Sequence, residues 1–194
     1  MGLDTRESQR HSQVQRFSLT IHIFRKENIL STAKTPIGTP LSPDECVAIA
    51  ATLGAQPDAW RPHVNHQPGV RHFERIVHEE SHEVYVISWV DDHDTGFHDH
   101  GVSCGAVHVL EGGIFEERLG FGESNLERLV EPGETIRFAP SYIHRFRPQD
   151  GIPTTSIHVY SPPLGAIGAY HRGDDGALIR TPIDGQAELV NLDA

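Results

Sequence analysis

From about residue 70 onward, the chain consists of short apolar runs in which hydrophobic and polar positions often alternate. Gly, Pro and Asp residues separate these runs, as is typical of turns between strands. No helical period interrupts them. The runs that we expect to be strands are EVYVISWV, GAVHVLEG, GIFEERL, TIRFAP and TSIHVYSP. Roughly seven or eight strands at this spacing favour a double-sheet sandwich or a barrel of the jelly-roll class.

The two ends of the chain have different patterns. Residues 1–15 are polar and follow neither period, so we expect a loose tail there and a single domain over residues 16–194. The run FSLTIHIF, at residues 17–24, alternates enough to be a strand. After residue 165, the pattern predicts one or two edge strands.

One helix is predicted near residue 42. Ser42 is a good N-cap, and Pro43 suits the first helical position. Glu45, three residues after Ser42, completes a capping box, and Gly54 should end the helix. The expected fold is therefore dominated by β-strands, with a small helical segment near the N-terminus.

Composition narrows the possible partners. With 16 Lys plus Arg against 27 Asp plus Glu, the net charge is -11, and no basic run could follow a phosphate backbone, so we expect no nucleic-acid partner. The longest apolar run near the N-terminus is too short for a signal peptide or a membrane span. Cys46 and Cys104 form no paired framework, which suits a reducing cytoplasm. The oligomeric state stays open between a monomer and a small homo-oligomer.

Fourteen histidines are the unusual feature of the composition. His98 and His100 lie two apart, so on a strand both imidazoles would face one side while Asp99 faces the other. His144, in FAPSYIHRF, could supply a third metal ligand from a neighbouring strand. The alternative is that the pair is solvated or structural, as most His-x-His pairs in β-rich proteins are.

Two longer motifs resemble the cupin family. HDHG followed by VLEG looks like the first cupin motif, and PGETIRFAPSYIHRF looks like the second. A cupin usually has a glutamate four or five residues after the second histidine, where Cys104 and Gly105 stand here. A cupin jelly-roll without this carboxylate, followed by HVYSPPL, is similar to the cysteine dioxygenase family of non-haem iron thiol dioxygenases. The resemblance covers about residues 41–170.

The resemblance implies an enzyme in which His98, His100 and His144 hold Fe(II). Three neutral imidazoles leave the full charge of the ion to attract a thiolate. The implied reaction adds both atoms of O2 to the sulfur of a small carboxylate thiol, most simply L-cysteine, to give a sulfinic acid. The alternative substrate is 3-mercaptopropionate or another small thiol. We expect no flavin or nicotinamide, because no GxGxxG motif is present.

An arginine would suit the carboxylate of such a substrate, because its planar fork forms charge-assisted bonds with carboxylates. Arg75 is the first candidate, because it precedes a strand that leads to a tryptophan, as the carboxylate-binding arginine of the family does. The alternative is that Arg75 pairs on the surface with Glu74 or Glu79, in which case Arg71 is the second candidate.

Ser156, His158 and Tyr160 alternate on the last long strand, so their side chains should share one face. They resemble the Ser-His-Tyr relay of the family, in which the tyrosine also contacts the substrate. Some relatives cross-link a cysteine to this tyrosine. Gly105 stands at the matching position here and Cys104 one residue earlier, so we expect no thioether, provided that the chain is irregular near Gly101 or Gly105.

Two other functions remain open on this fold. One is a cupin that binds a metal without catalysis and acts as a sensor, and the other is a sugar isomerase that uses another divalent metal. A sensor would not need the relay, and we find no DNA-binding or effector segment.

Overall fold

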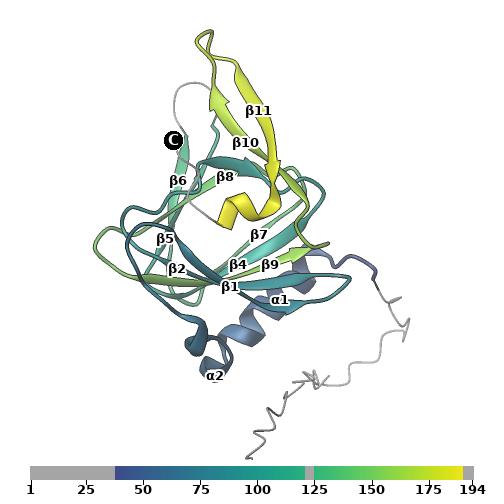
Figure 1. Ribbon diagram of the computed structural model, residues 1–194, viewed down its shortest axis with the longest axis vertical. Helices are drawn as coiled ribbons and strands as arrows, with labels where there is room; N and C mark the ends of the chain where they lie inside the picture. The colour runs from purple at the N-terminus through teal and green to yellow at the C-terminus, as the bar shows by residue number, and fades with distance from the viewer. Residues whose placement is uncertain (1–37, 121–124, 190–194) are drawn as a thin grey trace, which may run out of the picture. The chain divides into compact units, whose positions relative to one another are not determined.

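The computed structural model describes residues 38–120 and 125–189, and antiparallel strands dominate these residues (Figure 1). The predicted tail at 1–15 and the predicted strand at 17–24 lie outside the described residues. All the described residues belong to one unit, Thr35–Ala194. Within them, no helix is both long enough and apolar enough to cross a membrane.

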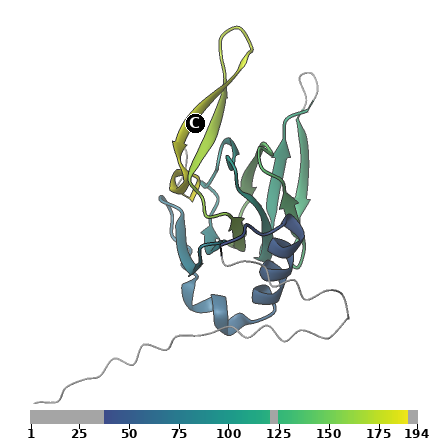
Figure 2. The same ribbon diagram turned by 90° about the vertical axis from the view of Figure 1, so that its right-hand side faces the viewer.

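The strands form two sheets that face each other across a shared core (Figure 2). The five-stranded sheet has the order β1-β2-β9-β4-β7, and the six-stranded sheet has the order β11-β10-β3-β8-β5-β6. The strands of the first sheet are β1 (His72–His78), β2 (Glu83–Trp89), β9 (Thr154–Ser161), β4 (Cys104–Glu111) and β7 (Thr135–Phe138). The strands of the second are β11 (Leu178–Asp184), β10 (Ala166–Arg172), β3 (Phe97–Asp99), β8 (His144–Pro148), β5 (Ile114–Arg118) and β6 (Leu126–Val130). The predicted β-dominated jelly-roll with a small helical segment is confirmed.

The predicted helix is α1, Pro43–Gly54. Its capping box is present, because the Ser42 hydroxyl accepts a hydrogen bond from the Glu45 N–H and the Glu45 carboxylate accepts one from the Ser42 N–H. The short helices α2 (Pro57–Trp60), η1 (Arg61–His63) and η2 (Gly185–Leu189) were not predicted, because each is too short to show a hydrophobic period.

The five-stranded sheet is covered on both faces, so that all residues of its strands β2 and β9 are buried. The helix α1 lies against its outer face (Figures 1 and 2). Its buried residues Cys46, Ala50 and Leu53 belong to the same core cluster as Val86 and Val159 of the sheet. The inner face carries the main core, whose side chains come from both sheets. They include Tyr85, Ile87, Trp89, Val107, Phe138, Tyr160, Ile114 and Phe146.

The C-terminal pattern forms a hairpin, β10–β11, with β11 at the edge of the six-stranded sheet. Of the one or two edge strands predicted after residue 165, one is therefore present as β11, whereas β10 lies inside the sheet between β11 and β3. β10 also pairs with β3, where Ala169 lies opposite His98. The hairpin therefore supports the strand that carries the histidine pair.

Candidate metal centre

The three predicted ligands lie together on the inner face of the six-stranded sheet. His98 on β3 is the direct cross-strand partner of His144 on β8, and His100 follows the end of β3. One ring nitrogen of each histidine lies within 4.8 Å of the others. The three rings are buried, with centroids 4.9 to 5.0 Å apart. This group could hold a metal ion, and it is the arrangement that the sequence predicted.

Backbone turns on both sides of β3 set the direction of the histidine pair. Gly96 and Gly101 have φ angles of 63° and 61°, a region that favours glycine. A Cβ on Gly101 would also collide with the carbonyl oxygen of Ala166. Asp99 faces away from the cluster and accepts hydrogen bonds from Arg180 at 2.6 and 2.9 Å. The two imidazoles therefore face the interior, and the hydrogen bonds between Asp99 and Arg180 hold the opposite side of the strand.

Hydrogen bonds select the tautomers of two of the ligands. His98 Nδ1 lies 3.0 Å from the carbonyl oxygen of Gly96, and His144 Nδ1 lies 3.3 Å from Oε1 of Glu116. Because carbonyl and carboxylate oxygens accept hydrogen bonds, both Nδ1 atoms donate, and each Nε2 keeps its lone pair. Burial lowers the pKa of His144 to about 3, so this ring is neutral near pH 7. Neutral imidazoles with an unprotonated Nε2 suit a divalent transition metal.

His144 Nε2 gives a direct test of the fit to a metal. It is buried and has no hydrogen-bond partner among residues 38–120 and 125–189. A buried polar atom without a partner costs about 1–3 kcal/mol, and a metal bond would remove that cost. The donor set and this atom therefore fit a resident metal ion.

Glu116 on β5 is a site residue that the sequence analysis missed. Its side chain is completely buried beside His144, and it also accepts hydrogen bonds from Arg128 Nε at 2.7 Å and from the Tyr142 hydroxyl at 3.2 Å. Burial raises the pKa of Glu116, but the hydrogen bonds from His144 and Arg128 outweigh it and lower the pKa below its usual value. The burial of Glu116 could have been predicted, because in GIFEERL this glutamate lies two residues after Ile114 and therefore on the same, core-facing side of the strand.

Glu116 contacts the back of a ligand and is not a member of the cluster. Within the described parts of the chain, the group of potential ligands consists of the three histidines. The Cys104 thiol lies on the outer face of the five-stranded sheet and donates to the carbonyl oxygen of Leu41 at 3.1 Å. The turn that follows His100, with its positive-φ Gly101, breaks the alternation that would have placed Cys104 beside His98.

The relay predicted on β9 forms one hydrogen-bonded row. Ser156 Oγ lies 2.9 Å from His158 Nε2, and His158 Nδ1 lies 2.9 Å from the Tyr160 hydroxyl, with all three residues completely buried. The row extends by one residue, because the Trp89 indole N–H donates to Ser156 Oγ at 2.8 Å. The sequence analysis gave Trp89 no role in the relay, since a hydrogen-bond donor on another strand has no local sequence signature.

The relay faces the metal centre across the core. The Tyr160 ring is centred 5.5 Å from that of His100. Phe146 fills the space between the His144 ring, at 4.2 Å, and the His158 ring, at 6.1 Å. The ligands on one sheet and the relay on the other therefore border the same interior space.

The two candidate arginines both lie on or beside β1. Arg75 is the cross-strand partner of Tyr85, which is itself the partner of His158. Its side chain is 39% exposed and pairs with Glu83 at 3.3 Å, not with Glu74 or Glu79. Hydrogen bonding to Glu83 raises the pKa of Arg75, so this guanidinium stays charged.

Arg71 is buried, in contrast to Arg75. Its guanidinium carbon lies 4.4 Å from the centre of the Trp89 ring, and its Nε donates to the carbonyl oxygen of Leu189 at 3.0 Å. His93 is also buried, and its pKa is lowered first by burial and then by the nearby Arg71 charge. Arg71 thus contacts Trp89, which is hydrogen-bonded to Ser156 of the relay. Arg75 pairs across strands with Tyr85, which pairs with His158 of the relay.

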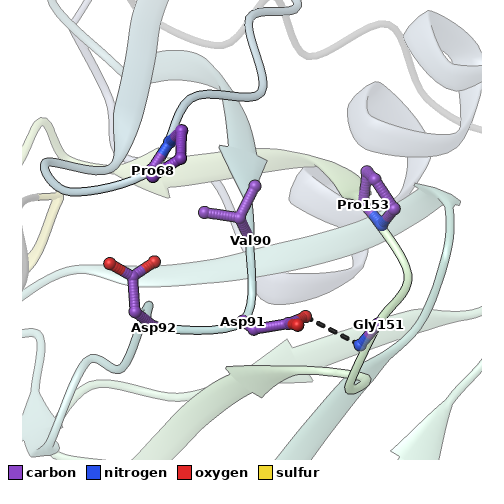
Figure 3. Close-up of a pocket in the computed structure, with 6 residues that line it drawn as sticks. All are labelled: Pro68, Val90, Asp91, Asp92, Gly151 and Pro153. Atoms are coloured by element: carbon purple, nitrogen blue, oxygen red, sulfur yellow. Dashed lines mark hydrogen bonds between the residues drawn. The ribbon is translucent and has the colours of Figure 1, made fainter.

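An open pocket of about 320 Å³ lies apart from these residues (Figure 3). Its lining residues are Pro68, Val90, Asp91, Asp92, Gly151 and Pro153. Asp91 closes one side by accepting a hydrogen bond from the Gly151 N–H at 2.7 Å. The lining includes neither the predicted ligands nor the relay residues, so this pocket is distinct from the metal centre.

Two facing antiparallel sheets with a histidine cluster on the inner face define the cupin class of metalloproteins. Among solved structures, similarity is found to the protein TT1209 from Thermus thermophilus, with 18% identity, a TM-score of 0.46, and coverage of 53% of this chain and 93% of that chain. KdgF from Halomonas sp. matches with 16% identity, a TM-score of 0.43, and coverage of 50% of this chain and 84% of that chain. A protein with a double-stranded beta-helix domain from Klebsiella pneumoniae matches with 14% identity, a TM-score of 0.46, and coverage of 62% of this chain and 92% of that chain.

The family is defined more closely by sequence. The family model for cysteine dioxygenase type I matches residues 38–173, which include all three histidines and the complete relay. The chain belongs to this family, and it is a cupin metalloenzyme of the cysteine dioxygenase type.

Proposed function

We propose that this protein is an iron-dependent thiol dioxygenase that converts L-cysteine to cysteine sulfinate. The observation that carries the proposal is a cluster that consists, among the described residues, of three histidines and no carboxylate. It faces the hydrogen-bonded row Tyr160–His158–Ser156 across the core. 3-Mercaptopropionate and other small carboxylate thiols are the alternative substrates.

His98, His100 and His144 would hold the ion through three neutral nitrogens. Bound Fe(II) would supply the redox chemistry that lets the sulfur react with O2. Because no ligand carries a negative charge, an anionic sulfur is favoured as a further ligand. The burial of all three rings keeps bulk water away from the reacting sulfur.

The relay would hold a proton at the Tyr160 hydroxyl. Trp89 donates to Ser156, and the Ser156 hydroxyl can then donate to His158 Nε2. When the hydrogen bonds run in this direction, His158 Nδ1–H donates to the Tyr160 oxygen, so the phenol proton can point toward the substrate. The opposite sense makes Tyr160 the donor to His158. Tyr160 can therefore give or accept a hydrogen bond without a buried charge on the row.

A cation on the inner side of β1 would select a carboxylate thiol. We assign this role to Arg75, because its cross-strand partner Tyr85 also pairs with His158 and its ring is centred 6.2 Å from that of Tyr160. Arg75 is already paired with Glu83, so the substrate carboxylate would share or displace that partner. Arg71, over the Trp89 ring, is the second candidate.

The overall step is balanced without another reactant. A thiolate and O2 give a sulfinate: two sulfur–oxygen bonds form, the O–O bond breaks, and the sulfur loses the four electrons that O2 gains. The test is oxygen uptake by the iron-loaded full-length chain with L-cysteine, with 3-mercaptopropionate, and with cysteamine, which lacks the carboxylate. Product mass should rise by two oxygen atoms, and zinc-loaded protein is the matched control.

The outcomes separate the candidate functions. Uptake with L-cysteine above that with 3-mercaptopropionate supports the proposed substrate, and the reverse order assigns the alternative one. No uptake with any thiol would contradict the enzyme proposal and favour a metal-binding sensor. Full occupancy by zinc or manganese in protein as purified, without iron-dependent turnover, would favour an isomerase.

A further inference from the structure

Glu116 is a buried carboxylate surrounded by hydrogen-bond donors. Arg128 Nε and the Tyr142 hydroxyl lie 2.7 and 3.2 Å from its oxygens, and His144 Nδ1 lies 3.3 Å from Oε1. The Glu116 side chain has no exposed area. Removing an ionised carboxylate from water is costly, so a glutamate at this core position needs a compensating role.

The negative charge of Glu116 is only partly balanced. Its hydrogen-bonded partner Arg128 is 54% exposed, and Arg118, which also interacts electrostatically with Glu116, is partly exposed, so water screens both positive charges. His144, on the opposite side, is fully buried and unscreened. The field of the carboxylate therefore acts mainly on the imidazole, where it stabilises a proton on Nδ1 and increases the electron density of Nε2.

We infer that Glu116 is the positioning residue of this metal centre: it fixes His144 in the tautomer that binds through Nε2, and it places behind that ligand the negative charge that the cluster itself lacks. The inference deepens the proposed function and rests on it only for the identity of the metal. The carboxylate that is missing four or five residues after His100 is thus replaced, one hydrogen bond further from the ion, by a residue of β5.

Glutamine at position 116 gives a sharp test. A carboxylate offers acceptors to all of its neighbours, whereas an amide offers one acceptor and one donor group. If the amide oxygen faces His144, the NH2 group meets the Arg128 N–H. If the amide is turned, its NH2 group meets His144 Nδ1 and moves the proton to Nε2, where it blocks the metal. Either orientation weakens the site.

Glu117→Gln is the matched control, because it makes the same change on the next residue of β5. Glu117 accepts from Asn125 and pairs with Arg145, and its side chain contacts none of the three ligands by hydrogen bond or ion pair. Arg128→Gln is the complementary variant, because it removes the cation that competes for Glu116 while the carboxylate stays in place.

The experiment measures Co(II) affinity by competition with a chelator on the full-length chain. Glu116→Gln should bind Co(II) about 10- to 100-fold more weakly than the Glu117→Gln control. Arg128→Gln should bind it about two- to fivefold more tightly than the natural protein, because Glu116 then acts more strongly on His144. A purely structural role for Glu116 would not give opposite changes in the two variants.

A second measurement uses metal-free protein. In a spectrum of protein labelled with 15N-histidine, the His144 signals, identified by their loss in His144→Gln, should show the proton on Nδ1. The Glu116→Gln variant should lose this preference. A tautomer that is the same in both proteins would overturn the inference, and so would equal Co(II) affinities for Glu116→Gln and Glu117→Gln.

The failure of this inference can be told apart from failure of the proposed function. Thiol oxidation by the natural protein, with unchanged Co(II) affinity in Glu116→Gln, overturns the inference alone. The predicted order of affinities in a protein that oxidises no thiol overturns the proposed function alone. If Glu116→Gln does not fold, Arg128→Gln still decides, because unchanged or weaker Co(II) binding in that variant contradicts the inference.

Discussion

Gly105 and Tyr160 are direct partners in the ladder between β4 and β9, and no side chain fits at position 105. A Cβ there would lie 2.5 Å from the Phe138 ring and would collide with the backbone oxygen of Val159. Phe138 in turn stacks on His100, with ring centroids 4.2 Å apart. Where some relatives join a cysteine to the tyrosine, this protein has an aromatic ring that stacks on a predicted metal ligand. The absence of a thioether stays a prediction, and this geometry is its support.

Gly105→Ala should therefore reduce the free energy of unfolding by about 3 kcal/mol, because backbone atoms cannot yield to the added methyl group. Chemical denaturation followed by circular dichroism measures the loss. Gly165→Ala is the control, since a Cβ at Gly165 has no neighbour within 4 Å and its backbone has no positive φ. Equal stability of the two variants would show that the sheet adapts around position 105.

Changing His98, His100 or His144 to Gln should abolish stoichiometric binding of iron, because two remaining ligands hold an ion weakly. Metal analysis after dialysis against a weak chelator gives the stoichiometry. His171→Gln serves as the control, since His171 is exposed on the β10–β11 hairpin. A triple-histidine site is contradicted if any single ligand variant keeps full iron content.

Tyr160→Phe should retain iron and lower kcat by about 100-fold, because the relay then ends without a hydroxyl at the substrate. Trp89→Phe should have a smaller effect, since it removes the donor to Ser156 but leaves the rest of the row intact. Steady-state oxygen uptake, normalised to bound iron, separates loss of chemistry from loss of metal. Unchanged kcat in Tyr160→Phe would remove this residue from the mechanism.

Arg75→Gln should raise KM for L-cysteine by roughly 10- to 100-fold, the loss expected for a charge-assisted hydrogen bond. Cysteamine should be unaffected, because it has no carboxylate to lose a partner. Arg71→Gln and the exposed Arg172→Gln are measured beside it. If only Arg71→Gln raises KM, the role of binding the substrate carboxylate belongs to Arg71, whose guanidinium lies over the Trp89 ring.

Asp99→Asn should reduce stability by about 2 kcal/mol at pH 7, because Asp99 is buried and accepts charge-assisted bonds from Arg180. The hydrogen bond from Arg180 holds the pKa of Asp99 well below its usual value. A depressed pKa means that the stabilisation is complete above about pH 5 and declines as the pH falls through the unfolded-state pKa of about 4. The difference between the two proteins should thus be equal at pH 7 and pH 5 and smaller at pH 3. A difference that grows at pH 3 would contradict this assignment.

Local patterns predicted much of this molecule. The strands on both faces of the core, the capping box at Ser42 and the shared face of His98 and His100 all follow from residues close together in the chain. From the sequence, we could expect only that the strand of His144 lies near the strand of His98. The structure shows that the two residues are direct cross-strand partners.

Contacts that depend on register between distant strands were beyond local reasoning. Glu116 meets His144 because β5 lies beside β8, and Trp89 meets Ser156 because β2 lies beside β9. Neither residue has a neighbour in sequence that suggests its partner. The choice between Arg71 and Arg75 has the same origin, since both precede the same tryptophan and only the sheet determines their exposure.

The predicted ligands and the relay come from opposite sheets. Phe138 packs against His100, and Phe146 packs between His144 and His158. In the proposed function, the room for a substrate beside the histidines would consequently depend on the size of these aromatic side chains. Exchanging Phe138 or Phe146 for a smaller or larger apolar residue would change that room while the three histidines and the relay residues stay unchanged. Single substitutions of core aromatic residues could therefore change which substrate fits this site.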